Sequence, residues 1–148
     1  MIAVVQRVLS ASVTVGDSVV GEIERGMLVL VAAQVNDTKP KIDWMANRLH
    51  GLRIFEDFEG KMNLACEEVN GKFLVVSNFT VAGDTKAGRR PSFTDAAPFE
   101  QGRELFDSLV AEMRRLGADV QTGAYGEEMT VSLVNDGPIT LIVESPRG

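Results

Sequence analysis

Short segments in which apolar residues alternate with polar ones, or follow one another without a break, run along most of the chain. Alternation is typical of a strand with one buried face, and an unbroken apolar run is typical of a strand buried on both faces. Gly16-Asp17 separates two such segments at the spacing of a hairpin. The pattern predicts strands at Ile2–Leu9, Ser12–Val15, Val19–Ile23, Met27–Ala33, Arg53–Phe55, Phe73–Val76, Val120–Thr122, Met129–Val134 and Ile139–Val143.

Two longer segments have the apolar spacing of helices. The first begins after Asn36-Asp37-Thr38, where a side-chain cap is expected and Pro40 stands in the first turn. The second is Pro98–Leu116, which Gly117 ends. Strands at both ends of the chain and two helices predict an α+β fold, with a barrel-like, mainly antiparallel curved sheet covered by the helices. No linker or repeat interrupts the pattern, so residues 1–148 are expected to form a single domain.

Composition narrows the class of protein. The chain has 148 residues, a net charge of −6 and 45% hydrophobic residues, which indicates a globular protein and argues against broad, non-specific binding to nucleic acids such as DNA. One cysteine, Cys66, and one histidine, His50, are too few for a Cys/His zinc site, and no metal or other cofactor is expected. A lone cysteine and a start without signal-peptide features favour the cytoplasm. No apolar run reaches the ~20 residues that span a bilayer, so no membrane partner is expected.

Ser77-Asn78-Phe79-Thr80 is the first candidate site. The segment follows the apolar strand Phe73–Val76 and presents hydroxyls, an amide and backbone N–H groups close together. Backbone N–H groups can stabilise an oxyanion without an ionisable side chain. The simpler interpretation is that Ser77 and Thr80 only satisfy hydrogen bonds at a strand end, which is the commoner role of such residues.

The second candidate is the segment Asn135–Thr140, between two predicted strands. Gly137 tolerates a positive φ, and Pro138 fixes its own φ and has no N–H, so a rigid loop with fixed carbonyls is expected. Such a loop could act as a gauge for a small ligand. Taken alone, the segment favours the simpler interpretation, an ordinary hairpin turn.

Charged side chains supply the remaining candidate groups. Lys86, Arg89 and Arg90 form a cluster of cations in an acidic protein, either a phosphate-binding patch or a solvated loop. His50 lies off the apolar stripe of its helix and is expected at the surface. The adjacent pairs Glu67-Glu68 and Glu127-Glu128 are interpreted as solvated charge, and no phosphate-binding loop or catalytic triad is visible.

Taken in order, these segments resemble the D-aminoacyl-tRNA deacylase family over nearly the whole chain. That family pairs a Ser-Gln-Phe-Thr-Leu motif with an Asn-x-Gly-Pro-x-Thr motif. The first reads Ser77-Asn78-Phe79-Thr80-Val81 here, and the second is complete at Asn135–Thr140. Further similar segments are Gln6-Arg7-Val8, Ala11-Ser12-Val13, Gly60-Lys61-Met62-Asn63 and Gly88-Arg89-Arg90-Pro91-Ser92-Phe93.

The resemblance implies a homodimer that hydrolyses the ester joining a D-amino acid to the 3′ end of tRNA, with glycine, such as that mischarged on tRNA(Ala), also accepted. It implies catalysis at Ser77, Asn78, Phe79 and Thr80, and tRNA contacts at Lys86, Arg89 and Arg90. It further implies that Gly137–Pro138 is cis and enters the partner subunit's site. Its carbonyls there hold the substrate amino group and leave no room for an L side chain; Asn135 and Thr140 belong to this chirality-selecting motif.

Asn78 and Val81 depart from the family pattern of glutamine and leucine. Val81 changes apolar shape slightly, whereas Asn78 is one methylene shorter, so a side-chain contact made by glutamine would change and a main-chain role would not. Two mechanisms remain open: activation of the ester by backbone N–H groups with help from the neighbouring ribose hydroxyl, or Thr80 as a nucleophile, for which no base is visible. Two other functions also remain open, a hydrolase of small D-amino-acid esters or amides and a non-catalytic dimeric module that binds tRNA ends.

Overall fold

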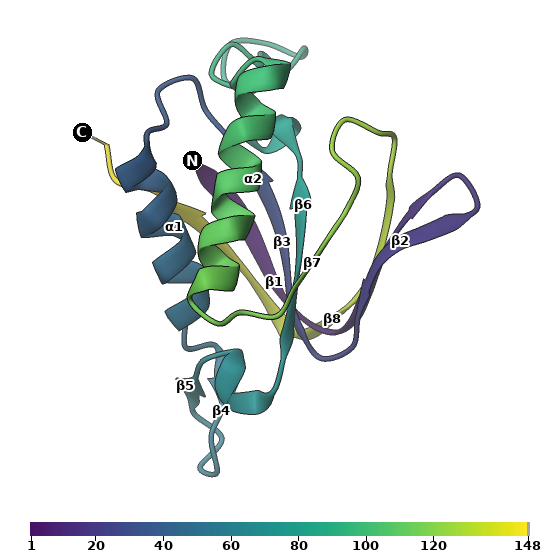
Figure 1. Cartoon of the computed structure of the whole chain (residues 1–148), viewed down its shortest axis with the longest axis vertical. Coiled ribbons are helices and arrows are strands. Elements are labelled where there is room, and N and C mark those ends of the chain that lie inside the picture. Colours follow the sequence, from purple (N-terminus) through teal and green to yellow (C-terminus); the bar gives the residue numbers. More distant parts are fainter. Residues whose placement is uncertain (148) are drawn as a thin grey trace.

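A curved six-stranded sheet forms the centre of the molecule, and two helices lie side by side over one of its faces (Figure 1). The computed structural model describes residues 1–147. The elements of the sheet are β1 (Ile2–Val15), β2 (Ser18–Ile23), β3 (Gly26–Ala32), β6 (Lys72–Ser77), β7 (Val120–Thr122) and β8 (Thr130–Glu144). The remaining elements are α1 (Lys39–Gly51), α2 (Phe99–Arg115), the small hairpin β4 (Phe55–Glu56) and β5 (Met62–Leu64), and the short 3-10 turns η1 (Glu67–Val69) and η2 (Phe79–Ala82).

The order of strands is β2-β1-β3-β6-β7, and β8 also pairs with β1. Strand β1 is antiparallel to β2, β3 and β8, whereas β3, β6 and β7 are mutually parallel, so the sheet is mixed. The edge strands almost meet: a Cβ atom added to Gly21 of β2 would lie 2.3 Å from the carbonyl oxygen of Thr122 in β7. The predicted α+β, barrel-like sheet covered by two helices is confirmed, with more parallel pairing than expected.

The core has two parts because the curved sheet buries residues on both faces. The larger part lies between the sheet and the helices, where α1 contributes Ile42, Met45, Ala46 and Leu49 and α2 contributes Phe106, Leu109, Val110 and Met113. The smaller part fills the inside of the curve and consists of Val8, Ala11, Val13, Ile23, Leu28, Leu74 and Val76. Strand β3 serves both parts, as its unbroken apolar run predicts.

Asn135–Thr140 is not a hairpin turn, contrary to the simpler prediction. Residues on both sides of it pair with β1 in the same antiparallel direction, as in Val5 with Leu141 and Ser10 with Val134. The segment is therefore a bulge inside one long strand, β8. The predicted strands Ile2–Leu9 and Ser12–Val15 are likewise joined into a single strand, β1.

The start of α1 also differs from the expectation. Thr38 is the N-cap residue, but no side chain makes a capping hydrogen bond. Asp37 instead accepts hydrogen bonds from the backbone N–H of Gln34 and from the amino group of Met1, with its Oδ1 atom 2.5 Å from the Met1 nitrogen. Within residues 1–147, no helix is long and apolar enough to cross a membrane.

Candidate active site

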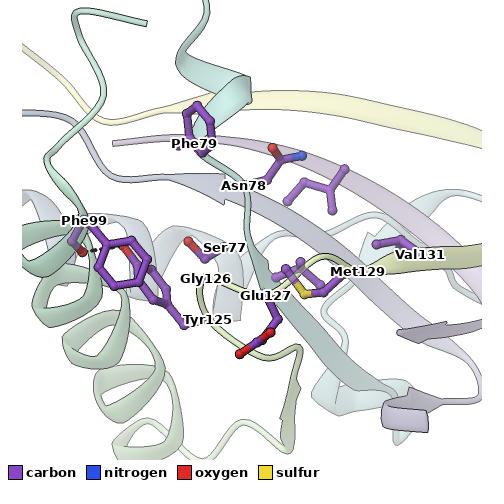
Figure 2. A pocket seen from close by; sticks show the side chains of 11 residues that line it. Ser77, Asn78, Phe79, Phe99, Tyr125, Gly126, Glu127, Met129 and Val131 are labelled. Carbon is purple, nitrogen blue, oxygen red and sulfur yellow. Dashed lines mark hydrogen bonds between the residues drawn. The ribbon is translucent and has the colours of Figure 1, made fainter. Parts of the chain in front are cut away.

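A pocket of about 600 Å³ opens where β6 ends and η2 begins (Figure 2). Ser77, Asn78 and Phe79 of the predicted site line it directly, whereas Thr80 is not among the lining residues and is hydrogen-bonded to Asn78. The other lining residues are Leu30, Val76, Phe99, Tyr125, Gly126, Glu127, Met129 and Val131. A pocket of this size, apolar over much of its wall and with a few polar groups at one end, is typical of a small-molecule site.

The turn at Asn78 is fixed by its own main chain. The Asn78 N–H donates to the carbonyl of Val31 at 2.8 Å, and its carbonyl accepts from the N–H of Val81 at 3.2 Å. Its side-chain oxygen accepts from the N–H of Thr80 at 3.2 Å and from the Thr80 hydroxyl at 2.5 Å. Among the described residues, the N–H of Phe79 has no acceptor outside its own helical turn. This N–H is therefore free to bind a ligand.

An aromatic wall stands across the pocket from this turn, and Figure 2 shows its two rings next to one another. The rings of Phe99 and Tyr125 lie 5.1 Å apart between centroids, and the Tyr125 hydroxyl donates to the Phe99 carbonyl at 2.7 Å. The Arg103 guanidinium lies over both rings, 5.2 Å and 4.9 Å from their centroids. Burial raises the pKa of Tyr125, so its hydroxyl stays protonated and able to donate. The wall is held rigidly.

Sequence reasoning missed this wall. Apolar spacing predicts Phe99 on the buried side of its helix, but 53% of its surface is exposed because it stands in the first turn of α2, where it lines the pocket. Glu127 also lines the pocket and is exposed, which is compatible with its interpretation as solvated charge. The signal available in the sequence was Gly126 between two large residues; its φ of +80° is a conformation that glycine adopts readily.

The bulge Asn135–Thr140 is held by side chains from β1 and from its own ends. Asn135 donates from Nδ2 to the carbonyls of Arg7 and Ile139, at 3.0 Å and 2.9 Å. The Thr140 hydroxyl accepts from Gln6 at 3.2 Å. The Gly137–Pro138 peptide bond is cis, as the resemblance implies.

The bulge and the pocket lie apart within this chain. The first part of β8 does reach the pocket, where Val131 lines it, but the bulge begins further along the strand, at Asn135. The two segments also lie at different levels of the sheet. Ser77 pairs with Val31 of β3, whereas Thr140 pairs with Gln6 of β1, which in turn pairs with Leu28 of β3. No residue of the bulge lines the pocket. The structure therefore brings Ser77–Thr80 together at one site but does not bring Asn135, Gly137, Pro138 or Thr140 to it.

Lys86, Arg89 and Arg90 are exposed on the loop between η2 and α2. Within residues 1–147, none of the three is in an ion pair. The loop is closed by paired backbone hydrogen bonds between Asp84 and Ser92, both 2.8 Å. It is attached to the site by Phe93, whose ring meets that of Phe79 edge to face at 5.3 Å. The loop that carries the cations is therefore joined, through Phe93, to a residue that lines the pocket.

The remaining reactive side chains lie elsewhere. His50 pairs with Glu67 at 2.9 Å, away from the pocket, as expected for a surface residue. Cys66 is fully buried, and burial raises the pKa of its thiol to about 12. Among the described residues, no group of three His, Cys, Asp or Glu side chains is arranged to hold a metal ion.

Comparison with known proteins gives consistent results over the whole chain. The family profile described as D-Tyr-tRNA(Tyr) deacylase matches residues 4–144. D-aminoacyl-tRNA deacylases from Desulfitobacterium hafniense and Thermotoga petrophila are 51% and 48% identical over 147 residues, which is 99% of this chain and 99% of each relative.

Solved structures are similar as well. The c-Myc DNA unwinding element binding protein superposes with a TM-score of 0.94 at 36% identity, covering 99% of this chain and 100% of that one. A probable eukaryotic D-amino acid tRNA deacylase superposes with a TM-score of 0.84 at 17% identity, covering 96% and 97%, and shows the same fold.

Proposed function

The chain belongs to the D-aminoacyl-tRNA deacylase family and is a hydrolase of D-aminoacyl-tRNA, and we propose that it cleaves the ester with backbone N–H groups rather than with an acid–base side chain. The observation that carries this proposal is the turn at Asn78–Thr80, which begins at the wall of a pocket that is lined by neither histidine nor cysteine. An aminoacyl ester is already activated, so polarising its carbonyl removes much of the barrier.

The proposed reaction takes place at the carbonyl carbon of the ester. Water attacks the ester carbon, and the oxygen of the tetrahedral intermediate is bound by the N–H groups of Phe79 and Thr80. The bond to the ribose oxygen then breaks, and the proton lost by the water ends on that leaving oxygen. The neighbouring ribose hydroxyl of the substrate helps to orient and deprotonate the water.

The competing mechanism uses Thr80 as a nucleophile. Its hydroxyl donates to the amide oxygen of Asn78, which is not a base, and no described carboxylate or histidine forms a hydrogen bond with it. A serine or threonine nucleophile requires such a base. The Thr80→Ala variant separates the mechanisms: near-normal turnover supports the main-chain mechanism, and loss of turnover in a folded protein supports the acyl-enzyme.

Chirality is selected across a homodimer in this proposal. The bulge of one subunit lies too far from its own pocket, so the carbonyls of Gly137 and Pro138 bind the substrate amino group in the partner's pocket. The side chain of an L-amino acid would collide with these carbonyls. Glycine has no side chain to exclude, so glycyl-tRNA is accepted. Support comes from exposed apolar residues on β1 and β8: Leu9, Val134 and Ile142 are 55%, 50% and 72% exposed.

The substrate's phosphates are bound by Lys86, Arg89 and Arg90 in this proposal. The position of the loop supports this assignment, because the loop is attached through Phe93 to Phe79, which lines the pocket. Cations that contact phosphates fix the orientation of a nucleic acid without reading its sequence. An enzyme of charged tRNA acts where translation takes place, in the cytoplasm.

The decisive experiment is hydrolysis of matched D- and L-aminoacyl-tRNA by the purified protein without added metal. Fast release from the D form and sparing of the L form support the proposal. Equal cleavage of a D-amino-acid ethyl ester, unaffected by salt, would favour a small-ester hydrolase. Binding of charged tRNA without release would favour a module that only holds tRNA ends.

A further inference from the structure

The side chain of Asn78 occupies donors that the reaction requires. Its Oδ1 atom accepts from both the N–H and the hydroxyl of Thr80, at 3.2 Å and 2.5 Å. An amide oxygen carries a partial negative charge and is close in size and polarity to an ester carbonyl oxygen. In the structure without substrate, Asn78 Oδ1 therefore stands where the substrate's carbonyl oxygen would have to bind.

We propose that Asn78 is an internal competitor for the oxyanion site, which rotates away when the substrate's carbonyl oxygen enters. This inference rests on the proposed function. It assigns Asn78 a positioning role: the residue controls access to the Thr80 N–H and does not itself take part in the bond changes. The free N–H of Phe79 binds the carbonyl first, and the N–H of Thr80 becomes available only after the side chain of Asn78 has moved.

The local geometry allows this motion. The main chain of Asn78 is held by Val31 and Val81 through two hydrogen bonds, so the backbone donors stay in place when the side chain turns. The side chain itself lines a pocket with room for it, and Figure 2 shows its amide at the pocket edge with Phe79 beside it. Rotation breaks the contacts with Thr80 without displacing the turn.

The length of the side chain matters for this role. Asparagine commonly accepts from the N–H two residues further on, a local turn that short polar side chains form. Glutamine is one methylene longer and is not among the residues that favour this turn. Replacing Asn78 with glutamine therefore keeps the amide chemistry but removes most of the competition for Thr80. Aspartate keeps the length and binds the same donors with a full negative charge, so it should compete more strongly.

The alternative is that Asn78 is only a structural cap of η2. A cap changes the stability of the turn. A competitor changes the affinity only for those ligands that bind the oxyanion donors. Two probes separate these effects: an RNA minihelix ending in a 3′-amide-linked D-alanine, which is not hydrolysed, and the same minihelix without the amino acid. Only the first presents a carbonyl oxygen to the turn.

The experiment measures the Kd of both probes for the wild type and for Asn78→Ala, Asn78→Gln and Asn78→Asp. We expect alanine and glutamine to tighten binding of the charged minihelix by about three- to tenfold, the equivalent of one ordinary hydrogen bond. Aspartate should weaken it by at least as much. Binding of the uncharged minihelix should be the same in all four proteins, and urea unfolding monitors any change in the turn itself.

Two results would overturn the inference. Unchanged affinity for both probes in Asn78→Ala, with only a lower unfolding midpoint, would make Asn78 a plain cap. Weaker binding of the charged minihelix in both Asn78→Ala and Asn78→Gln would make it a residue that contacts substrate. If the wild type bound neither minihelix, the proposed function would fail as well, and hydrolysis of D-aminoacyl-tRNA would already have shown this separately.

Discussion

The guanidinium of Arg7 lies with its Nε atom 3.1 Å from a carboxylate oxygen of Asp136, and this ion pair joins β1 to the bulge of β8. The Arg7 side chain is 6% exposed and that of Asp136 is 30% exposed. Arg7 also donates from Nη1 to the carbonyl of Ile54 at 2.8 Å, so one buried cation ties the bulge to the segment that leads into the β4–β5 hairpin. Arg7 therefore adds an ion pair to the hydrogen bonds of Asn135 and Thr140 that hold the bulge.

We expect Arg7→Met to destabilise the protein by about 3 kcal/mol, because it leaves the Ile54 carbonyl and a partly buried carboxylate without a partner. Asp136→Asn should cost about 1 kcal/mol, since its amide oxygen can still face Arg7 and the group is closer to water. Urea unfolding of both variants at one protein concentration measures the difference. Equal losses would mean that Arg7 contributes only through Asp136.

The aromatic wall of the pocket can be tested with two glycines. Gly126 and Gly16 both have positive φ, +80° and +57°, so an alanine at either position is strained by about 1–2 kcal/mol. A Cβ atom at Gly126 would lie 2.7 Å from the Phe99 ring, whereas nothing lies within 4 Å of one at Gly16. Gly126→Ala should therefore also displace Phe99.

Steady-state hydrolysis of D-aminoacyl-tRNA distinguishes the two variants. We expect Gly126→Ala to lower kcat/KM by roughly tenfold, about 1.4 kcal/mol of lost transition-state stabilisation, and Gly16→Ala to leave it nearly unchanged. Similar activity in the two variants, at similar stability, would show that Phe99 does not shape the functional pocket.

Much of the fold follows from the sequence, and the exceptions have physical causes. Apolar periodicity located β3 and both helices because burial there is continuous. It divided β1 at Ser10-Ala11 and β8 at Asn135–Pro138, because polar and turn-forming residues look like strand ends when the pairing of β1 with β8 is not known. The parallel pairing of β3 with β6 joins residues more than forty positions apart, a separation that local patterns do not encode.

Only part of the candidate site could be predicted from the sequence. Ser77–Thr80 follows a strand end, which a sequence shows, but the Phe99–Tyr125 wall depends on where the start of α2 meets the turn before β8. The hydrogen bond from the Tyr125 hydroxyl to the Phe99 carbonyl creates that contact, and no spacing in the sequence reveals it. The predicted single domain of residues 1–148 stays a prediction.

Replacing Lys86, Arg89 and Arg90 together with alanine should weaken tRNA binding in a salt-dependent way. Loss of three phosphate contacts should lower the slope of log affinity against log salt by about 2–3. The matched control replaces Lys39, Lys41 and Arg48 of α1, which carry the same charge far from the pocket. Equal slopes for the two triple variants would remove the loop from the tRNA contact surface.

Cys66 should be unreactive in the folded protein. Its pKa of about 12 keeps the thiol protonated at pH 8, and it is fully buried, so iodoacetamide should label it only after unfolding. The pKa is raised above the ordinary 9.0, so the folded state holds this proton more tightly. The thiol's contribution to stability is complete below pH 9 and falls as the pH rises toward 12. Rapid labelling of the native protein at pH 8 would contradict this.

The bulge in β8 also sets a rule for the length of the chain. Gln6 pairs with Thr140 and Ser10 with Val134, so four steps along β1 match six along β8. Side chains in a strand alternate between faces, so the length of the bulge decides which part of the core each half of β8 serves: Val131 and Leu133 pack against the smaller part, and Val143 belongs to the larger. Inserting or deleting one residue here would turn half of the strand inside out, whereas a change of two would keep the alternation in phase.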